Sequence, residues 1–148
     1  MKIEFTKEQF EILLKVTYFG NWMANAHRTE EQIKKYEEME DYIFSFAKQF
    51  GFDKYVDDEE SEKRKFYPTR IFEEETDIQE LIEEYDKETF WDELINRLGE
   101  RDFYKKYGIE KIKKMNRDER FKKLNECIND WIDEINQYGI DRLKIVKD

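Results

Sequence analysis

Residues 116–139 read NRDERFKKLNECINDWIDEINQYG, and this stretch decides the fold class. Its apolar side chains recur at steps of three, four, three, four and three residues: Phe121, Leu124, Ile128, Trp131, Ile135 and Tyr138. Such spacing places them on one side of an α-helix. Asn116 and Glu119 form a capping box before it, and Gly139 is a typical residue after a helix end. The stretch therefore predicts a helix over 117–138.

Three more capping boxes lie upstream. Each pairs a threonine with a glutamine three residues later: Thr6 with Gln9, Thr29 with Gln32, and Thr76 with Gln79. Asp86 is a further N-cap candidate, and Gly51 suits the end of a helix. The apolar spacing after these caps predicts helices over 6–28, 30–50, 77–85 and 87–107.

The helical pattern fails between Phe52 and Phe72. Residues 57–65 contain no apolar side chain, and the only proline, Pro68, follows them. We expect a long charged surface loop here, with 53–65 as the first site of proteolysis. The short, β-branched tail 140–146 predicts an extended strand that pairs with residues 2–5. The sequence thus predicts an all-α single domain over 1–148, a compact bundle of about five helices with a long charged loop and short extended termini.

The composition agrees with a helical domain. The 148 residues are 39% hydrophobic and 43% charged, with only five glycines and one proline, which excludes disordered, collagen-like and turn-rich β-proteins. The net charge of −10 should repel nucleic acid and anionic membranes, so we expect neither as a partner. The longest stretch without a charged side chain, 16–27, is too short to span a bilayer. The N-terminus has no signal-peptide pattern, and the single cysteine fits a cytoplasmic protein.

Counting residues excludes several chemistries within one chain. His27 is the only histidine and Cys127 the only cysteine, which rules out catalytic triads, haem ligation and transition-metal sites built from these side chains. No two glycines are close enough for a phosphate-binding loop. We therefore expect no metal site, no cofactor and no catalytic residues.

The low numbers of histidine, cysteine and glycine do not exclude a site in which carboxylates bind magnesium. Glu37 with Glu40 and Glu83 with Asp86 are three residues apart, so each pair projects from one helix face. This spacing resembles that of the all-α nucleoside triphosphate pyrophosphohydrolases, which implies a magnesium-dependent hydrolase. Composition alone gives roughly nine such acidic pairs. We therefore favour a solvated acidic face as the interpretation.

The charge is unevenly distributed along the chain. Residues 73–93 are strongly acidic, whereas 105–123 contain nine bases: Lys105, Lys106, Lys111, Lys113, Lys114, Arg117, Arg120, Lys122 and Lys123. With its interleaved aromatic residues, this basic segment is a candidate for tracking a nucleic-acid backbone. A match to the acidic segment, within or between subunits, and a solvated helix face are the simpler interpretations.

The first predicted helix combines apolar residues on two sides with a polar line. Because Phe10, Leu13 and Leu14 cover one side and Ile12, Val16, Phe19 and Met23 the other, we expect the helix to be buried nearly all round. Its polar side chains fall on one face: Thr17, Asn21, Asn25 and Arg28. Buried polar groups need partners, and we expect Arg101 and Asp102 to supply them. A structural hydrogen-bond network is the favoured interpretation, and a ligand pocket is the alternative.

These observations favour a non-catalytic protein. We predict a small helical interaction or regulatory module, with a basic protein or a second copy of the chain as its partner. A carboxylate–magnesium hydrolase of nucleotides or small molecules and nucleic-acid binding through 105–123 are the two alternatives.

Overall fold

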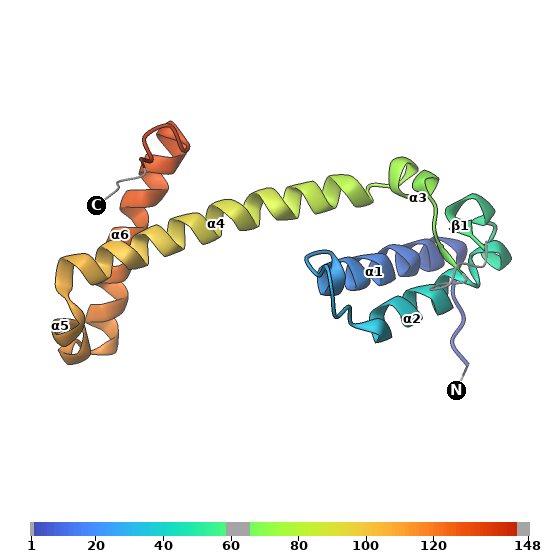
Figure 1. Cartoon of the computed structure of the whole chain (residues 1–148), viewed down its shortest axis with the longest axis horizontal. Coiled ribbons are helices and arrows are strands. Elements are labelled where there is room, and N and C mark those ends of the chain that lie inside the picture. Colours follow the sequence, from blue (N-terminus) through green and yellow to red (C-terminus); the bar gives the residue numbers. More distant parts are fainter. Residues whose placement is uncertain (1, 59–65, 145–148) are drawn as a thin grey trace. The chain divides into compact units, whose positions relative to one another are not determined.

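The computed structural model describes residues 2–58 and 66–144 and confirms the all-α class (Figure 1). Its α-helices are α1 (Lys7–Asn25), α2 (Lys34–Phe44), α3 (Arg70–Glu75), α4 (Ile78–Tyr107), α5 (Ile109–Lys114) and α6 (Arg117–Tyr138). Two 3₁₀ turns, η1 (Ala47–Phe50) and η2 (Asp53–Tyr55), and two strands, β1 (Val56–Asp57) and β2 (Tyr67–Pro68), complete the described elements. Contacts divide the chain into an N-terminal unit, Met1–Ile82, and a C-terminal unit, Glu83–Asp148.

Helix α1 begins where the sequence predicts. The Thr6 hydroxyl accepts a hydrogen bond from the Gln9 backbone at 3.2 Å, and the Thr6 backbone donates to the Gln9 side chain at 3.0 Å. This reciprocal pair satisfies two N–H groups that the first helical turn leaves open. Helix α1 ends at Asn25 rather than at residue 28.

The capping box predicted at Thr29 and Gln32 does not form. Residues 26–33 are not helical, and α2 begins at Lys34 without a side-chain cap. The Asn25 side chain holds the backbone of Ile33, and these bonds replace the predicted first turn of a helix. The predicted helix end at residue 50 is also wrong, because α2 ends at Phe44; Gly51 instead closes η1 with a left-handed φ of +76°.

The region predicted as a long surface loop supplies part of the core. Strands β1 and β2 form a small antiparallel ribbon in which Val56 pairs with Pro68, and Thr69 caps α3. The sequence analysis expected strands only at the termini, so it missed this ribbon. At the termini, residues 2–6 are irregular and 139–142 form a turn instead of the expected strand pair. Residues 59–65, where most of the predicted cleavage region lies, and the end of the tail are outside the described residues.

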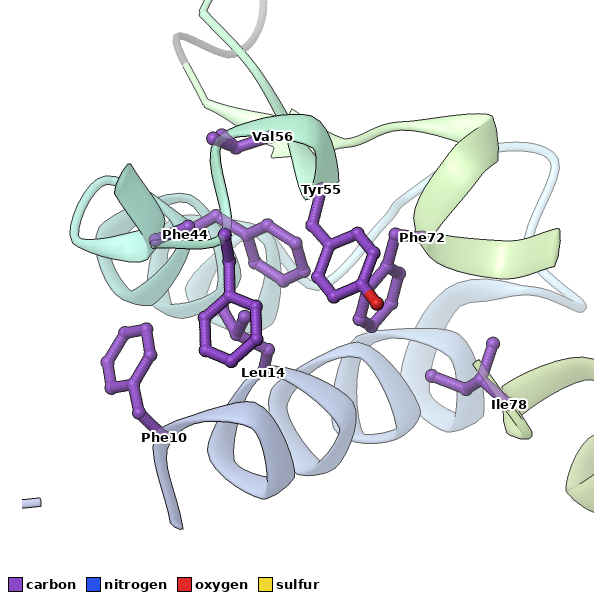
Figure 2. Close-up of a cluster of buried hydrophobic side chains, with 9 residues drawn as sticks. Phe10, Leu14, Phe44, Tyr55, Val56, Phe72 and Ile78 are labelled. Atoms are coloured by element: carbon purple, nitrogen blue, oxygen red, sulfur yellow. The ribbon is translucent and has the colours of Figure 1, made fainter. Parts of the chain in front are cut away.

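The N-terminal unit has an aromatic core assembled from distant segments (Figure 2). Phe44 and Phe72 are fully buried, and their ring centres lie 5.3 Å apart in an edge-to-face contact. Each buried ring contributes about 1.5–3 kcal/mol. Phe10 and Leu14 bring α1 onto this cluster, and Ile78 adds the first turn of α4.

The C-terminal unit is built from consecutive helices. Helix α4 is continuous through Asp86, where the sequence predicted a break, because no proline or glycine interrupts it before Gly99. Thr76 donates to the Phe72 carbonyl at the end of α3 instead of capping α4. Helix α5 lies between the helices predicted over 87–107 and 117–138, where no helix was predicted, whereas α6 has the predicted bounds and the predicted Asn116 cap.

Helices α4 and α6 approach closely at Gly99. A Cβ atom there would lie 2.7 Å from Ile128 Cγ1 and 3.0 Å from Ile128 Cα. Glycine is therefore required by the space available at this crossing. Beyond the crossing, Phe103, Ile112 and Cys127 form the small buried cluster of the unit.

Candidate functional site

The N-terminal unit contains a pocket of about 370 Å³ beside the C-terminal half of α1. Helix α1 and the chain that follows it supply most of the lining, α2 supplies two glutamates, and β2 and α3 supply one residue each. The lining residues are Tyr18, Asn21, Trp22, Asn25, Ala26, Arg28, Gln32, Glu37, Glu40, Pro68 and Glu73. Three of the predicted polar-line residues, Asn21, Asn25 and Arg28, therefore lie together in a pocket.

Asn25 and Asn21 fix one wall of this pocket. Asn25 is 6% exposed, donates to the Asn21 side-chain oxygen at 2.8 Å, and accepts from the Ile33 backbone at 2.7 Å. Asn21 in turn donates to a Glu40 oxygen at 2.9 Å. The buried amide of Asn25 and the half-buried amide of Asn21 thus have partners, as polar groups removed from water require. The chain of bonds ties α1 to α2 and to the turn between them.

The other two members of the polar line behave differently. Arg28 is half-buried, and its Nε donates to the Ala24 carbonyl at 2.9 Å. Thr17 does not line the pocket, because its hydroxyl donates to the Leu13 carbonyl one turn earlier. Thr17 therefore bonds to the backbone of its own helix rather than contributing to the site.

Tyr18 and Glu73 form the opposite side. The Tyr18 hydroxyl donates to Glu73 Oε1 at 2.7 Å, which joins α1 to α3. Burial, together with this hydrogen bond and the nearby carboxylate charge, raises the pKa of the Tyr18 phenol far above its usual value. Tyr18 therefore stays protonated and keeps donating to Glu73.

The lining is acidic. Glu37, Glu40 and Glu73 supply three carboxyl groups against the single guanidinium of Arg28. Glu40 is 1% exposed, so the interpretation of the Glu37–Glu40 pair as a solvated face is wrong for Glu40. Charges in such a recess are screened less than charges on an open surface. The rings of Tyr18 and Trp22 add aromatic surface against which a cation can pack.

Arg101 and Asp102 are not the partners of this network. They belong to α4 in the C-terminal unit, where they pair with each other at 2.8 and 3.2 Å. Trp131 Nε1 also donates to Asp102 at 2.9 Å. The hydrogen bond from Arg101 holds the pKa of the Asp102 carboxyl below its usual value. The expected partnership with α1 was wrong because Glu40 and Ile33 fill that role.

The basic segment runs over the end of α4, α5 and the start of α6. Eight of its nine bases are exposed, and Lys123 is half-buried. Lys113 pairs with Glu110 at 3.0 Å, and Lys123 pairs with Glu119, one helical turn away in each case. The ammonium groups of Lys106, Lys111 and Lys123 lie 5.0–5.7 Å from the centre of the Tyr107 ring. Nucleic-acid binding here stays a hypothesis.

Across residues 2–58 and 66–144, no three histidine, cysteine, aspartate or glutamate side chains are grouped so that they could hold a metal ion. Glu83 and Asp86 are exposed on α4, as expected of a solvated acidic face. The magnesium hydrolase stays a hypothesis. No helix in the same part of the chain is long and apolar enough to cross a membrane.

The sequence missed Tyr18, Trp22 and Glu73 as members of the site. Tyr18 and Trp22 lie in the uncharged part of α1, where they resembled core residues. Glu73 belongs to a stretch without helical periodicity, so nothing indicated where its side chain lies. Comparison with protein-family models, with curated proteins and with solved structures gives no match for this chain.

Proposed function

We propose that this chain is a non-catalytic interaction module whose pocket accepts a cationic side chain of a basic protein partner. The observation that supports the proposal is the lining of the pocket, in which three carboxyl groups and two aromatic rings surround a recess with one guanidinium. Lysine and arginine side chains combine an apolar stem with a charged end. Such a group matches both kinds of lining.

The size and field of the site fit this ligand class. A volume of about 370 Å³ lies at the small end of ligand pockets, which suits one side chain better than a large cofactor. The net charge of −10 attracts a basic partner over long distances, and the recess then selects one of its side chains. Asn21 and Asn25 hold the wall rigid, which reduces the entropy lost on binding.

The test is a titration of the full chain with a fluorescein-labelled peptide of alternating arginine and glycine, followed by fluorescence anisotropy. Glu37→Gln and Glu73→Gln should each weaken binding by about tenfold, which corresponds to about 1.4 kcal/mol. Each variant removes one carboxylate from the lining and nearly preserves the side-chain volume.

Matched controls are Glu38→Gln and Glu74→Gln, which remove the same charge from exposed positions next to the pocket residues. These controls should bind almost as tightly as the unchanged protein. Equal losses for controls and pocket variants would show that only overall charge attracts the peptide. That result, or no binding at all, overturns the proposal.

A further inference from the structure

Helix α1 has an open side as well as a side that faces the core. Phe10, Leu14 and Asn25 are the buried residues among its 19, so the expectation that this helix is buried nearly all round is wrong. The C-terminal half of α1 and the chain after it line the pocket of the N-terminal unit instead. Charged groups of this pocket that have no partner in the chain are therefore open to a ligand.

Two side chains of opposite charge line the pocket without pairing. Glu37 on α2 and Arg28 beyond the end of α1 are both half-buried. Within residues 2–58 and 66–144, the Arg28 side chain makes one polar contact, from Nε to the Ala24 carbonyl, and the Glu37 carboxylate makes none. Both charges have lost part of their hydration without an ion pair to replace it. The pocket therefore suits a ligand that carries one group of each sign.

The two signs lie at different heights along α1. Ala24, whose carbonyl holds the Arg28 guanidinium, is six residues after Tyr18, which is about 9 Å along the helix axis. The Tyr18 hydroxyl holds Glu73 at the other end of this length. A ligand that bridges the two ends therefore has its cation near Tyr18 and its anion near Ala24, as an extended arginine or lysine residue with a carboxylate can.

We propose that the pocket binds the last residue of its partner protein, an arginine or lysine with a free terminal carboxylate. This inference rests on the proposed function, in which the pocket accepts a cationic side chain, and adds an anion held by Arg28. A guanidinium has five N–H donors in a planar fork, and the bond to Ala24 uses the one on Nε. The two Nη groups are left to hold both oxygens of the carboxylate.

Size and charge favour a terminal residue over an internal one. A recess of about 370 Å³ suits one residue, and a terminal arginine or lysine carries both charges within one residue. An internal arginine or lysine brings only the cation, which Arg28 repels. An acidic side chain elsewhere in the partner would supply a carboxylate, but it would weaken the attraction to a chain of net charge −10. Every protein already has a terminal carboxylate.

The test compares three peptides of alternating arginine and glycine, labelled with fluorescein at the N-terminus, by fluorescence anisotropy with the full chain. The first ends in arginine with a free carboxylate, and the second ends in arginine with an amide. The third has the composition of the first but ends in glycine with a free carboxylate. The first should bind about tenfold more tightly than the others, which corresponds to about 1.4 kcal/mol. Overall charge alone would favour the amide.

Arg28→Gln tests the assigned role of the guanidinium. This variant should lose the preference for the first peptide and should bind the amide at least as tightly as the unchanged protein, because a repelling charge is gone. Lys34→Gln is the matched control, since it removes a base from an exposed position on α2 that does not line the pocket. It should keep the tenfold preference. Circular dichroism should show unchanged helical content in both variants.

The outcomes separate this inference from the proposed function. Equal binding of the three peptides, with the losses expected for Glu37→Gln and Glu73→Gln, overturns the terminal residue and leaves the cation pocket in place. Binding of none of the peptides overturns both. A preference that persists in a folded Arg28→Gln variant overturns the role of Arg28. If that variant loses helical content, the three peptides with the unchanged protein decide.

Discussion

The two units bury their apolar residues in different ways. The core of the N-terminal unit joins nine buried residues from α1, α2, both 3₁₀ turns, β1, α3 and the start of α4. The C-terminal cluster joins three, Phe103, Ile112 and Cys127, from helices consecutive in the chain. The pockets of the two units differ in the same way. The pocket in the N-terminal unit is lined by α1, α2, β2, α3 and the chain after α1, whereas a pocket of about 360 Å³ in the C-terminal unit is lined by α4 and α6 alone, at Asp102, Lys105, Lys106, Cys127, Asp130 and Trp131.

The strongest test of this comparison removes one ring from the larger core. Phe72 is fully buried against Phe44, Tyr55 and Tyr18, so Phe72→Ala should lower the free energy of unfolding by about 3–5 kcal/mol. The loss should appear in the fluorescence of Trp22 during urea unfolding, in a variant with Trp91 and Trp131 replaced by phenylalanine.

Phe103→Ala is the counterpart in the C-terminal unit, where Phe103 is 1% exposed. If the units unfold separately, Phe103→Ala leaves the Trp22 transition in place. In a second variant that keeps Trp131 and has phenylalanine at positions 22 and 91, Phe72→Ala leaves the Trp131 transition in place. A single shared transition in both variants would contradict that independence. The single domain predicted over 1–148 stays a prediction, and this measurement addresses it.

A smaller effect is expected where α4 crosses α6. In Gly99→Ala, the new methyl group would meet both the side chain and the backbone of Ile128, so α6 must shift. We expect the C-terminal unit to lose about 1–3 kcal/mol from overpacking, reduced by up to about 1 kcal/mol of helix propensity.

A double-mutant cycle with Ile128→Ala checks the cause of this loss. Removing Ile128 Cγ1 should relieve part of the clash, so the double variant should be more stable than the sum of the two losses predicts. Full additivity would show that residues 99 and 128 do not meet, and the close crossing would be excluded.

The smallest expected effects depend on pH and differ between the units. The raised pKa of Tyr18 contributes stability that is complete below about pH 10, where the unfolded phenol titrates, and is lost as pH rises further. The lowered pKa of Asp102 contributes stability above about pH 4 that is lost on acidification. Tyr18→Phe should flatten the alkaline dependence of the N-terminal unit, and Asp102→Asn the acidic dependence of the C-terminal unit. Urea unfolding across the pH range measures both, and unchanged slopes would contradict the assignments.

Capping residues and end glycines predicted a helix correctly where neighbouring residues alone determine its two ends. Helix α6 has its predicted bounds because Asn116 caps it and Gly139 ends it with a φ of +56°. The capping box predicted at Thr29 is wrong because the side chain of Asn25, the last residue of α1, bonds to the backbone of Ile33 and holds the chain out of a helix there. Phe52, Tyr55 and Val56 were assigned to a loop because short 3₁₀ and strand segments have no repeating period.

The candidate site was predictable only where one helix determined it. Asn21 and Asn25 share a face of α1 through helical spacing alone, whereas Arg28 lies beyond the end of the helix. Their partners come from α2 and from the turn before it, and Glu73 comes from α3, so those depend on how the chain folds back. Arg101 and Asp102 were chosen from helical spacing in the same way, but each found its partner one residue away.

The buried thiol of Cys127 is a natural probe of the C-terminal unit. Burial leaves this side chain 4% exposed and raises its pKa, although Cys127 also lines the pocket of the C-terminal unit. No second cysteine in the sequence competes for a thiol-specific reagent. The labelling rate of the unmodified protein, compared with the rate in denaturant, therefore measures how strongly the smaller core protects this thiol, without any engineered probe.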